Sequence, residues 1–123
     1  MKQKAKLKDL NKNIEEEVII EVEKIQFVGF SNTLPYQLTI GMEYDVLLGI
    51  TILDEFHISE IESQIKQLIP FNNSFGYTIR GVLRKGGFID AGIVFQDEVL
   101  EEFEYLFNKY VEIKVDRISV EFV

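Results

Sequence analysis

The chain has 123 residues, no cysteine, 46% apolar residues and a formal net charge of −8. This length suits one domain with a core of its own, and the missing cysteines exclude a disulfide scaffold and thiolate chemistry. Because the apolar runs are short and no apolar stretch follows the first residues, we predict neither a membrane span nor a secretory signal, and we expect a cytoplasmic protein.

Positive charge is concentrated at the start of the chain. Residues 1–13 hold five of the thirteen basic residues, and we expect them to form a lysine-rich tail or a short helix. We expect residues 14–123 to form a single α+β domain. Residues 13–123 carry eight basic and twenty acidic residues, a net charge of −12. Such a body repels nucleic-acid phosphate and anionic membranes and attracts a basic partner surface.

Alternating apolar and polar residues predict the first strands. Residues 17–30 read as one strand whose phase slips at Glu23-Lys24, which favours a β-bulge there. Residues 31–35 read as a turn. The next alternation is longer, and Gly41 divides it into a short strand near 36–40 and a longer one near 43–53. Its even positions are predicted to face the core: Leu38, Ile40, Met42, Tyr44, Val46, Leu48, Ile50 and Ile52.

Two later segments have helical spacing. Ser59 and Glu62 have the spacing of a capping box, and apolar residues follow at intervals of three and four until Pro70 ends the pattern. Asp97 is a good N-cap for a second helix. The apolar stripe of that helix comprises Val99, Leu100, Phe103, Leu106, Phe107 and Tyr110. We expect Ile65 from the first helix and Phe103 from the second to lie in the core.

Strands are also predicted around the second helix. Residues 75–95 alternate on either side of Arg84-Lys85-Gly86-Gly87, which predicts a hairpin. The last strand spans 111–122, and its phase slips at Asp116-Arg117, again favouring a bulge. The predicted order is β-β-β-α-β-β-α-β. We therefore expect an α+β domain with a strongly curved, mainly antiparallel sheet or partly closed barrel, and two covering helices.

Recognisable catalytic and metal-binding patterns are lacking. His57 is the single histidine, so triads and multi-histidine metal sites lack their parts. The Gly81–Gly87 segment has its lysine before the last glycines and no hydroxyl after them, unlike a phosphate loop. No acidic spacing matches a calcium loop. We therefore predict no catalytic residue, no metal and no cofactor, and we expect that the protein is not an enzyme.

Two binding functions remain open. The first is an acidic protein-interaction domain, of the inhibitor or immunity type found among bacterial and phage accessory proteins, that binds a basic partner surface. Its candidate residues form an acidic face: Glu98, Glu101, Glu102, Glu104, Glu60 and Glu62. The alternative is an oligonucleotide-binding barrel that uses Arg80, Arg84, Lys85 and Lys114. We favour the first, because acids outnumber these cations and most aromatics fall on core positions. Homo-oligomer formation is left open.

Overall fold

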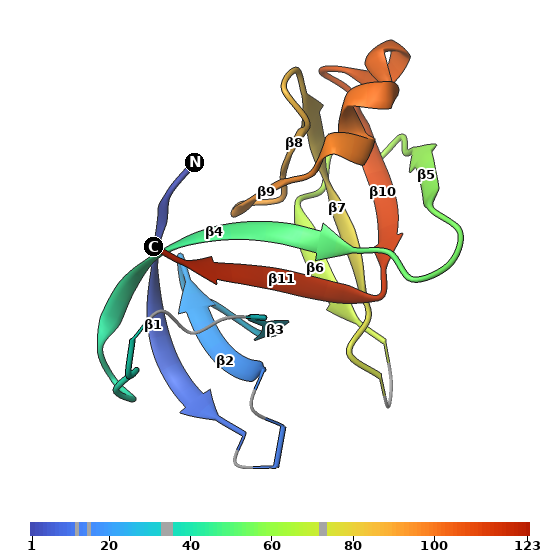
Figure 1. The fold of residues 1–123 in the computed structure, drawn as a ribbon. Coiled ribbons are helices and arrows are strands. Elements are labelled where there is room, and N and C mark those ends of the chain that lie inside the picture. Colours follow the sequence, from blue (N-terminus) through green and yellow to red (C-terminus); the bar gives the residue numbers. More distant parts are fainter. Residues whose placement is uncertain (12, 15, 33–35, 72–73) are drawn as a thin grey trace.

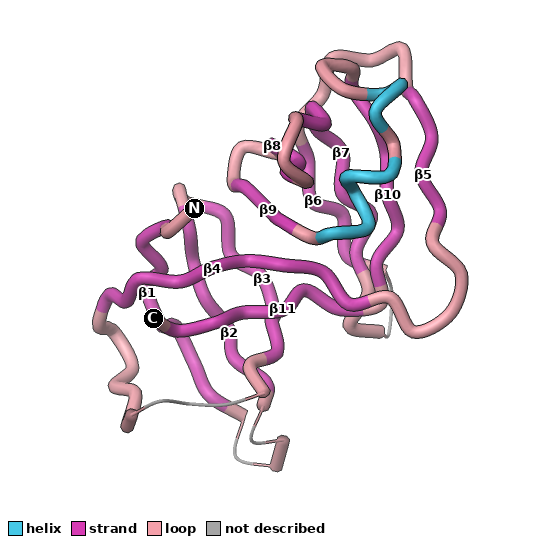
Figure 2. The backbone as a smooth tube through the Cα atoms, turned by 45° about the horizontal axis from the view of Figure 1, so that its top comes forward, coloured by secondary structure: helices cyan, strands magenta, loops and turns pink. Residues whose placement is uncertain are grey.

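The chain folds into a closed barrel and a second sheet that lies against it (Figures 1 and 2). The computed structural model describes residues 1–11, 13–14, 16–32, 36–71 and 74–123. The predicted turn at 31–35 lies partly outside the described residues.

Five strands form the barrel, in the closed order β1-β2-β3-β11-β4. Neighbouring strands are antiparallel except β3 and β11, which are parallel and in register at Phe30 and Ser119. The first four strands come from the N-terminal half of the chain and the fifth from its end. Their bounds are β1 (Gln3–Leu10), β2 (Glu17–Val22), β3 (Ile25–Phe30), β4 (Glu43–Thr51) and β11 (Arg117–Phe122).

The second sheet is built from the residues between β4 and β11. Its order is β5-β10-β7-β8-β9, and β6 also pairs with β7. Its strands are antiparallel. Their bounds are β5 (His57–Glu60), β6 (Gln67–Pro70), β7 (Tyr77–Arg84), β8 (Phe88–Asp90), β9 (Val94–Gln96) and β10 (Tyr110–Val115).

The lysine-rich start is a barrel strand, and the expected tail or short helix was wrong for residues 3–10. Ala5 and Leu7 are fully buried, while Lys4, Lys6 and Lys8 between and beside them are exposed. This alternation is expected for a barrel strand that has one face toward the core and the other toward solvent. The alternation was hard to recognise in the sequence, because its buried positions include Ala5, a weakly apolar residue, among exposed lysines.

The predicted α+β class was also wrong: in the described residues, the helical structure consists of two short 3₁₀ segments. These are η1 (Glu98–Glu102) and η2 (Glu104–Leu106), which replace the second helix. Asp97 caps η1 as expected, since its side chain accepts a 3.0 Å bond from the Val99 N–H. After η2 the chain pairs with β7 instead of continuing as a helix. The Asn108 N–H donates to the Leu83 carbonyl at 2.7 Å, and the Leu83 N–H donates to the Lys109 carbonyl at 3.1 Å.

The first predicted helix is replaced by two short strands, β5 and β6. Ser59 lies in β5, which pairs with β10, and Leu68 lies in β6, which pairs with β7. The segment is rich in isoleucine, a β-branched residue that favours strands, and available strand partners outweighed the helical spacing. As a result Ile65, expected in the core, is 41% exposed.

The two predicted bulges are a turn and a crossing between sheets. Glu23 and Lys24 both have positive φ and form the tight turn between β2 and β3, the conformation that two-residue hairpin loops require. Asp116 joins β10 in the second sheet to β11 in the barrel. Each change of phase therefore marks the end of one strand and the start of the next.

The predicted burial of even-numbered residues is confirmed for β4 but fails on either side of Gly41. Val46, Leu48 and Ile50 are buried. Gly41 has φ 93° in a turn, and Ile40 and Met42 beside it are 55% and 56% exposed. The turn breaks the strand, so Ile40 and Met42 beside it leave the core, whereas Leu38, further from the turn, is buried as predicted.

One apolar core joins the barrel to the second sheet. Phe27 of β3 and Phe95 of β9 pack edge to face with ring centroids 6.3 Å apart. The Gln3 side-chain amide also bridges the two parts: it donates to the Val94 carbonyl at 2.7 Å and accepts from the Val94 N–H at 2.9 Å. These contacts hold β9 and the start of η1 over the outside of β4.

Candidate functional site

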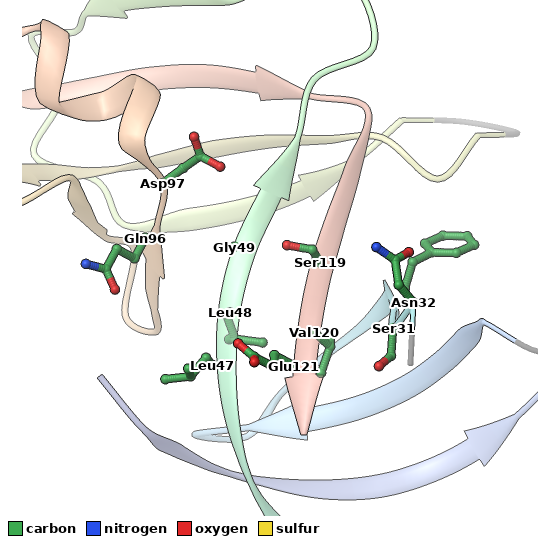
Figure 3. Close-up of a pocket in the computed structure, with 11 residues that line it drawn as sticks. Ser31, Asn32, Leu47, Leu48, Gly49, Gln96, Asp97, Ser119, Val120 and Glu121 are labelled. Atoms are coloured by element: carbon green, nitrogen blue, oxygen red, sulfur yellow. The ribbon is translucent and has the colours of Figure 1, made fainter. Parts of the chain in front are cut away.

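A cleft of about 470 Å³ lies over β4 and β11, where the end of β9 approaches the barrel. Gly49 of β4 lies opposite Ser119 of β11 in the cleft lining. A Cβ added at Gly49 would lie 2.7 Å from the Ser119 Oγ and 3.2 Å from the Gln96 carbonyl oxygen, so glycine lets β9 come close. In Figure 3, Gln96 and Asp97 stand on one side of the two strands, and Ser31 and Asn32 stand on the other.

The cleft combines carboxylates with neutral polar and apolar groups. Asp97 and Glu121 supply the two carboxylates. Among its lining residues there is no Lys or Arg; one cation lies at its wall, where the Arg117 guanidinium sits over the Phe30 ring at 4.6 Å from the centroid. The remaining lining residues are Ser31, Asn32, Leu47, Leu48, Gly49, Gln96, Ser119 and Val120.

Two further hollows share Asp97 with the cleft. One is lined by Asp97, Glu98, Val99, Glu101 and Glu102, and the other by Gly86, Gln96, Asp97, Glu98 and Glu101. The lining of all three therefore contains carboxylates but no Lys or Arg. Hollows lined by one sign of charge over a low-dielectric wall concentrate the electric field and attract oppositely charged groups. We call Asp97, Glu98, Glu101, Glu102 and Glu121 the acidic cleft.

Four residues of the predicted acidic face lie on η1 and η2, and two lie elsewhere. Glu98, Glu101, Glu102 and Glu104 are all exposed, and none of them forms an ion pair in the described part of the chain. Glu60 lies on β5 and pairs with Lys109 at 3.6 Å. Glu62 follows β5 in an exposed loop. The structure thus brings the η1 glutamates together with Asp97 but does not add Glu60 and Glu62 to them.

The four cations of the nucleic-acid alternative lie on the second sheet, outside the barrel. The Arg80 Nε donates to Glu112 at 2.7 Å, and its Nη1 donates to Gln67 at 3.2 Å. Arg84 donates to the Asn108 side chain, also at 3.2 Å. Lys85 is exposed on the turn after β7, and Lys114 lies on β10 opposite His57. These residues do not form a basic groove along the barrel.

Sequence reasoning missed the part of the acidic cleft that depends on β11 and β9. Asp97 was predicted only as a helix cap, and no role was predicted for Glu121. Local patterns could not show more, because the contact between β9 and β4 joins residues far apart in the chain. The available signal was Gly49, a residue without a side chain on the outward face of a long strand, which is typical of close backbone approach.

A family model described as "Uncharacterised conserved protein UCP019853" matches residues 1–123. The chain belongs to this family. The comparisons with curated proteins and with solved structures found no match.

Neither a membrane-spanning helix nor a metal-binding cluster is present in the described residues. In the described residues, no helix has the length and apolar character needed to cross a bilayer. Over the same residues, no cluster of three or more His, Asp or Glu side chains is arranged to hold a metal ion.

Proposed function

We propose that this protein is a non-catalytic interaction domain whose acidic cleft binds a basic surface on a partner protein. One observation carries the proposal: three adjoining hollows that share Asp97 are lined by five carboxylates and by no Lys or Arg. The glutamates on η1 have no ion-pair partner within the described residues, so their charge is available to a partner.

The shape of the cleft suggests how a partner would be held. A Lys or Arg side chain entering it would pass between Asp97 and Glu121, while its methylene groups lie against Leu47 and Val120. The Ser119 hydroxyl and the Gln96 amide offer further hydrogen-bond acceptors. The η1 glutamates, at the rim, would mainly speed association and select against acidic partners.

Charge reversal at the cleft tests this proposal against net charge alone. The first variant carries Glu98→Lys, Glu101→Lys and Glu102→Lys. The matched control carries Glu16→Lys, Glu23→Lys and Glu43→Lys, three exposed positions on the barrel, and therefore changes the net charge equally. Binding of a fluorescein-labelled oligolysine peptide is measured by anisotropy at low ionic strength, with circular dichroism as the folding control.

We expect the cleft variant to lose at least about tenfold in affinity. Each rim pair contributes roughly 0.2–1 kcal/mol, so three lost pairs approach the 1.4 kcal/mol that corresponds to a factor of ten. The barrel variant should lose much less. Equal losses in the two variants would show that the probe senses only total charge, and the proposal would fail.

Two finer expectations belong to the same proposal. Inhibition of the partner, as in inhibitors and immunity proteins, is tested by assaying the partner's activity once co-purification has identified it. The cytoplasmic location is tested by cell fractionation.

The second candidate is an oligonucleotide-binding module, favoured by the closed five-stranded barrel. Such barrels bind on the face of their second and third strands. Here that face is partly occupied, because the Val28 N–H donates to the Tyr77 hydroxyl at 3.0 Å and Ile25 lies beside Gly92. Salt-dependent binding of a labelled single strand would support this candidate, and no binding at low salt would remove it.

A further inference from the structure

The edges of the second sheet differ in how they are protected. At β9 the Gln3 side chain occupies the Val94 N–H and carbonyl. At β6 the strand ends in Pro70, which has no N–H to offer a neighbour. β5 is the remaining edge: it pairs with β10 on one side, and in the described residues no strand pairs with its other side. Unprotected edges are templates for an added strand.

The register identifies which backbone groups of β5 face outward. The Ile61 N–H donates to the Tyr110 carbonyl at 2.9 Å, so odd-numbered residues of this segment direct their backbone groups toward β10. Backbone direction alternates along an antiparallel strand. Ile58 and Glu60 therefore direct their N–H and C=O groups away from the sheet, where an incoming strand would meet them.

A hollow of about 540 Å³ lies along this edge. It is lined on one side by an aromatic row, in which Phe103 lies 5.6 Å from Phe56 and 6.3 Å from Tyr105 between ring centroids. Tyr105 is 71% exposed, so its ring face is accessible to a strand that enters the hollow. The other lining residues are His57, Ile58, Ser59, Glu112 and Lys114.

The charged residues around β5 indicate which kind of strand would bind there. A second hollow shares His57 and Lys114 with the first and is lined by Asp54, Glu55 and Asp116. Together the two hollows present four carboxylates, counting Glu112, against Lys114, and Arg80 pairs with Glu112 at the margin. A second copy of this chain would bring Glu55, Glu60 and Glu62 against the same residues, so like charges disfavour it.

We propose that the free edge of β5 binds an extended basic segment of a partner protein by strand addition. The segment's backbone pairs with Ile58 and Glu60, and its alternate Lys or Arg side chains lie over Phe103 and Tyr105, where aromatic faces attract cations. The choice of a basic occupant rests on the function proposed above, whereas the mode of binding rests on the geometry of β5.

Two probes separate strand pairing from charge. The first is a short labelled peptide that alternates Arg and Thr, and the second has the same sequence with N-methyl groups on every second backbone amide. Both carry the same charge, but only the first can pair along its whole length. Wild-type protein should bind the unmodified peptide at least about tenfold more tightly. Equal affinity for the two peptides, or no binding of either, would overturn the proposal.

A matched pair of variants locates the pairing on β5. Glu60→Pro removes an outward N–H that the β10 pairing does not use, while Glu60→Ala makes the same charge change and keeps the N–H. The preference for the unmodified peptide should disappear in the first variant and persist in the second. If it persists in both, the pairing is elsewhere and the proposal fails. If sedimentation shows a dimer that Glu60→Pro dissociates, the occupant is a second copy and the proposal is wrong.

The η1 reversal variant keeps this test distinct from the test of the proposed function. It should leave the preference for the unmodified peptide unchanged, because no η1 glutamate lines the hollows at β5. Failure of the acidic cleft would thus appear as equal losses in the two charge-reversal variants, and failure of strand addition as a lost preference in wild type.

Discussion

Phe95 is the residue whose truncation best tests the joint between the barrel and the second sheet. It is fully buried in β9 and packs edge to face on Phe27 of the barrel. Removing the ring forfeits a transfer free energy of about 1.5–3 kcal/mol and an aromatic pair of about 0.5–1.5 kcal/mol. With the cavity left behind, Phe95→Ala should lower the free energy of unfolding by about 3–5 kcal/mol.

Phe103→Ala is the matched control, because it removes the same group from a half-buried site. The sequence alone, which placed Phe103 in the core, predicts a loss as large as that at Phe95. The structure predicts a smaller loss, since Phe103 lies at the margin of the core and is only partly buried. Urea unfolding followed by fluorescence and circular dichroism measures both variants.

The shared core also determines how cooperative the unfolding transition is. Because the two parts share one core, both probes should report a single transition in wild type and in Phe95→Ala. A loss below about 1 kcal/mol at Phe95, or two separate transitions in wild type, would refute the shared core.

Three further predictions concern single contacts. Gly81→Ala would place a Cβ against the backbone oxygen of Asp90, so chemical denaturation should show a loss of at least about 1–3 kcal/mol; an unchanged midpoint would contradict the packing of β8 on β7. Gln3→Ala removes the two hydrogen bonds to Val94 and should cost about 1–3 kcal/mol in the same assay, with no loss showing that the bridge is dispensable. Burial opposes ionisation of Asp90, but hydrogen bonds from Lys66 and the Gly92 N–H outweigh it and lower the pKa of Asp90 below its ordinary value. The ionised Asp90 carboxylate therefore stabilises the fold above pH 3.8, and this contribution is lost as the pH falls further. Between pH 4 and 2, thermal unfolding should show a smaller loss of stability for Asp90→Asn than for wild type. An equal loss in the two proteins would refute this role of Asp90.

Strand positions could be predicted from the sequence wherever one face is apolar and the other polar. In β4 and β10 the buried residues are those that alternation selects, because side-chain direction in a strand has a period of two. The hairpin from β7 to β8 was equally visible, since Gly86 and Gly87 supply the positive φ values of its turn. A curved sheet or partly closed barrel was expected, but as part of an α+β fold with two covering helices, which the closed barrel and the two short 3₁₀ segments contradict.

The helices could not be judged from local spacing. Ile58, Ile61, Ile65 and Leu68 satisfy a helical interval, yet the same segment contains alternating polar and β-branched residues that satisfy a strand. Whether this segment forms a helix or strands depends on whether β10 and β7 have edges available for pairing. That is a property of the folded structure and cannot be read from the local sequence. The same non-local cause explains why acids at 97 and 121 meet in one cleft while Glu60 and Glu62 lie elsewhere.

Mapping a bound basic peptide by amide chemical shifts tests the central claim most directly. With ¹⁵N-labelled protein and the oligolysine probe, the account predicts saturable shifts centred on Gly49, Gln96, Asp97 and Ser119, with the η1 glutamates at their margin. Shifts centred instead on the acids of the barrel, around Glu43 and Asp45, or small shifts spread over the whole surface, would contradict an acidic cleft as the binding site.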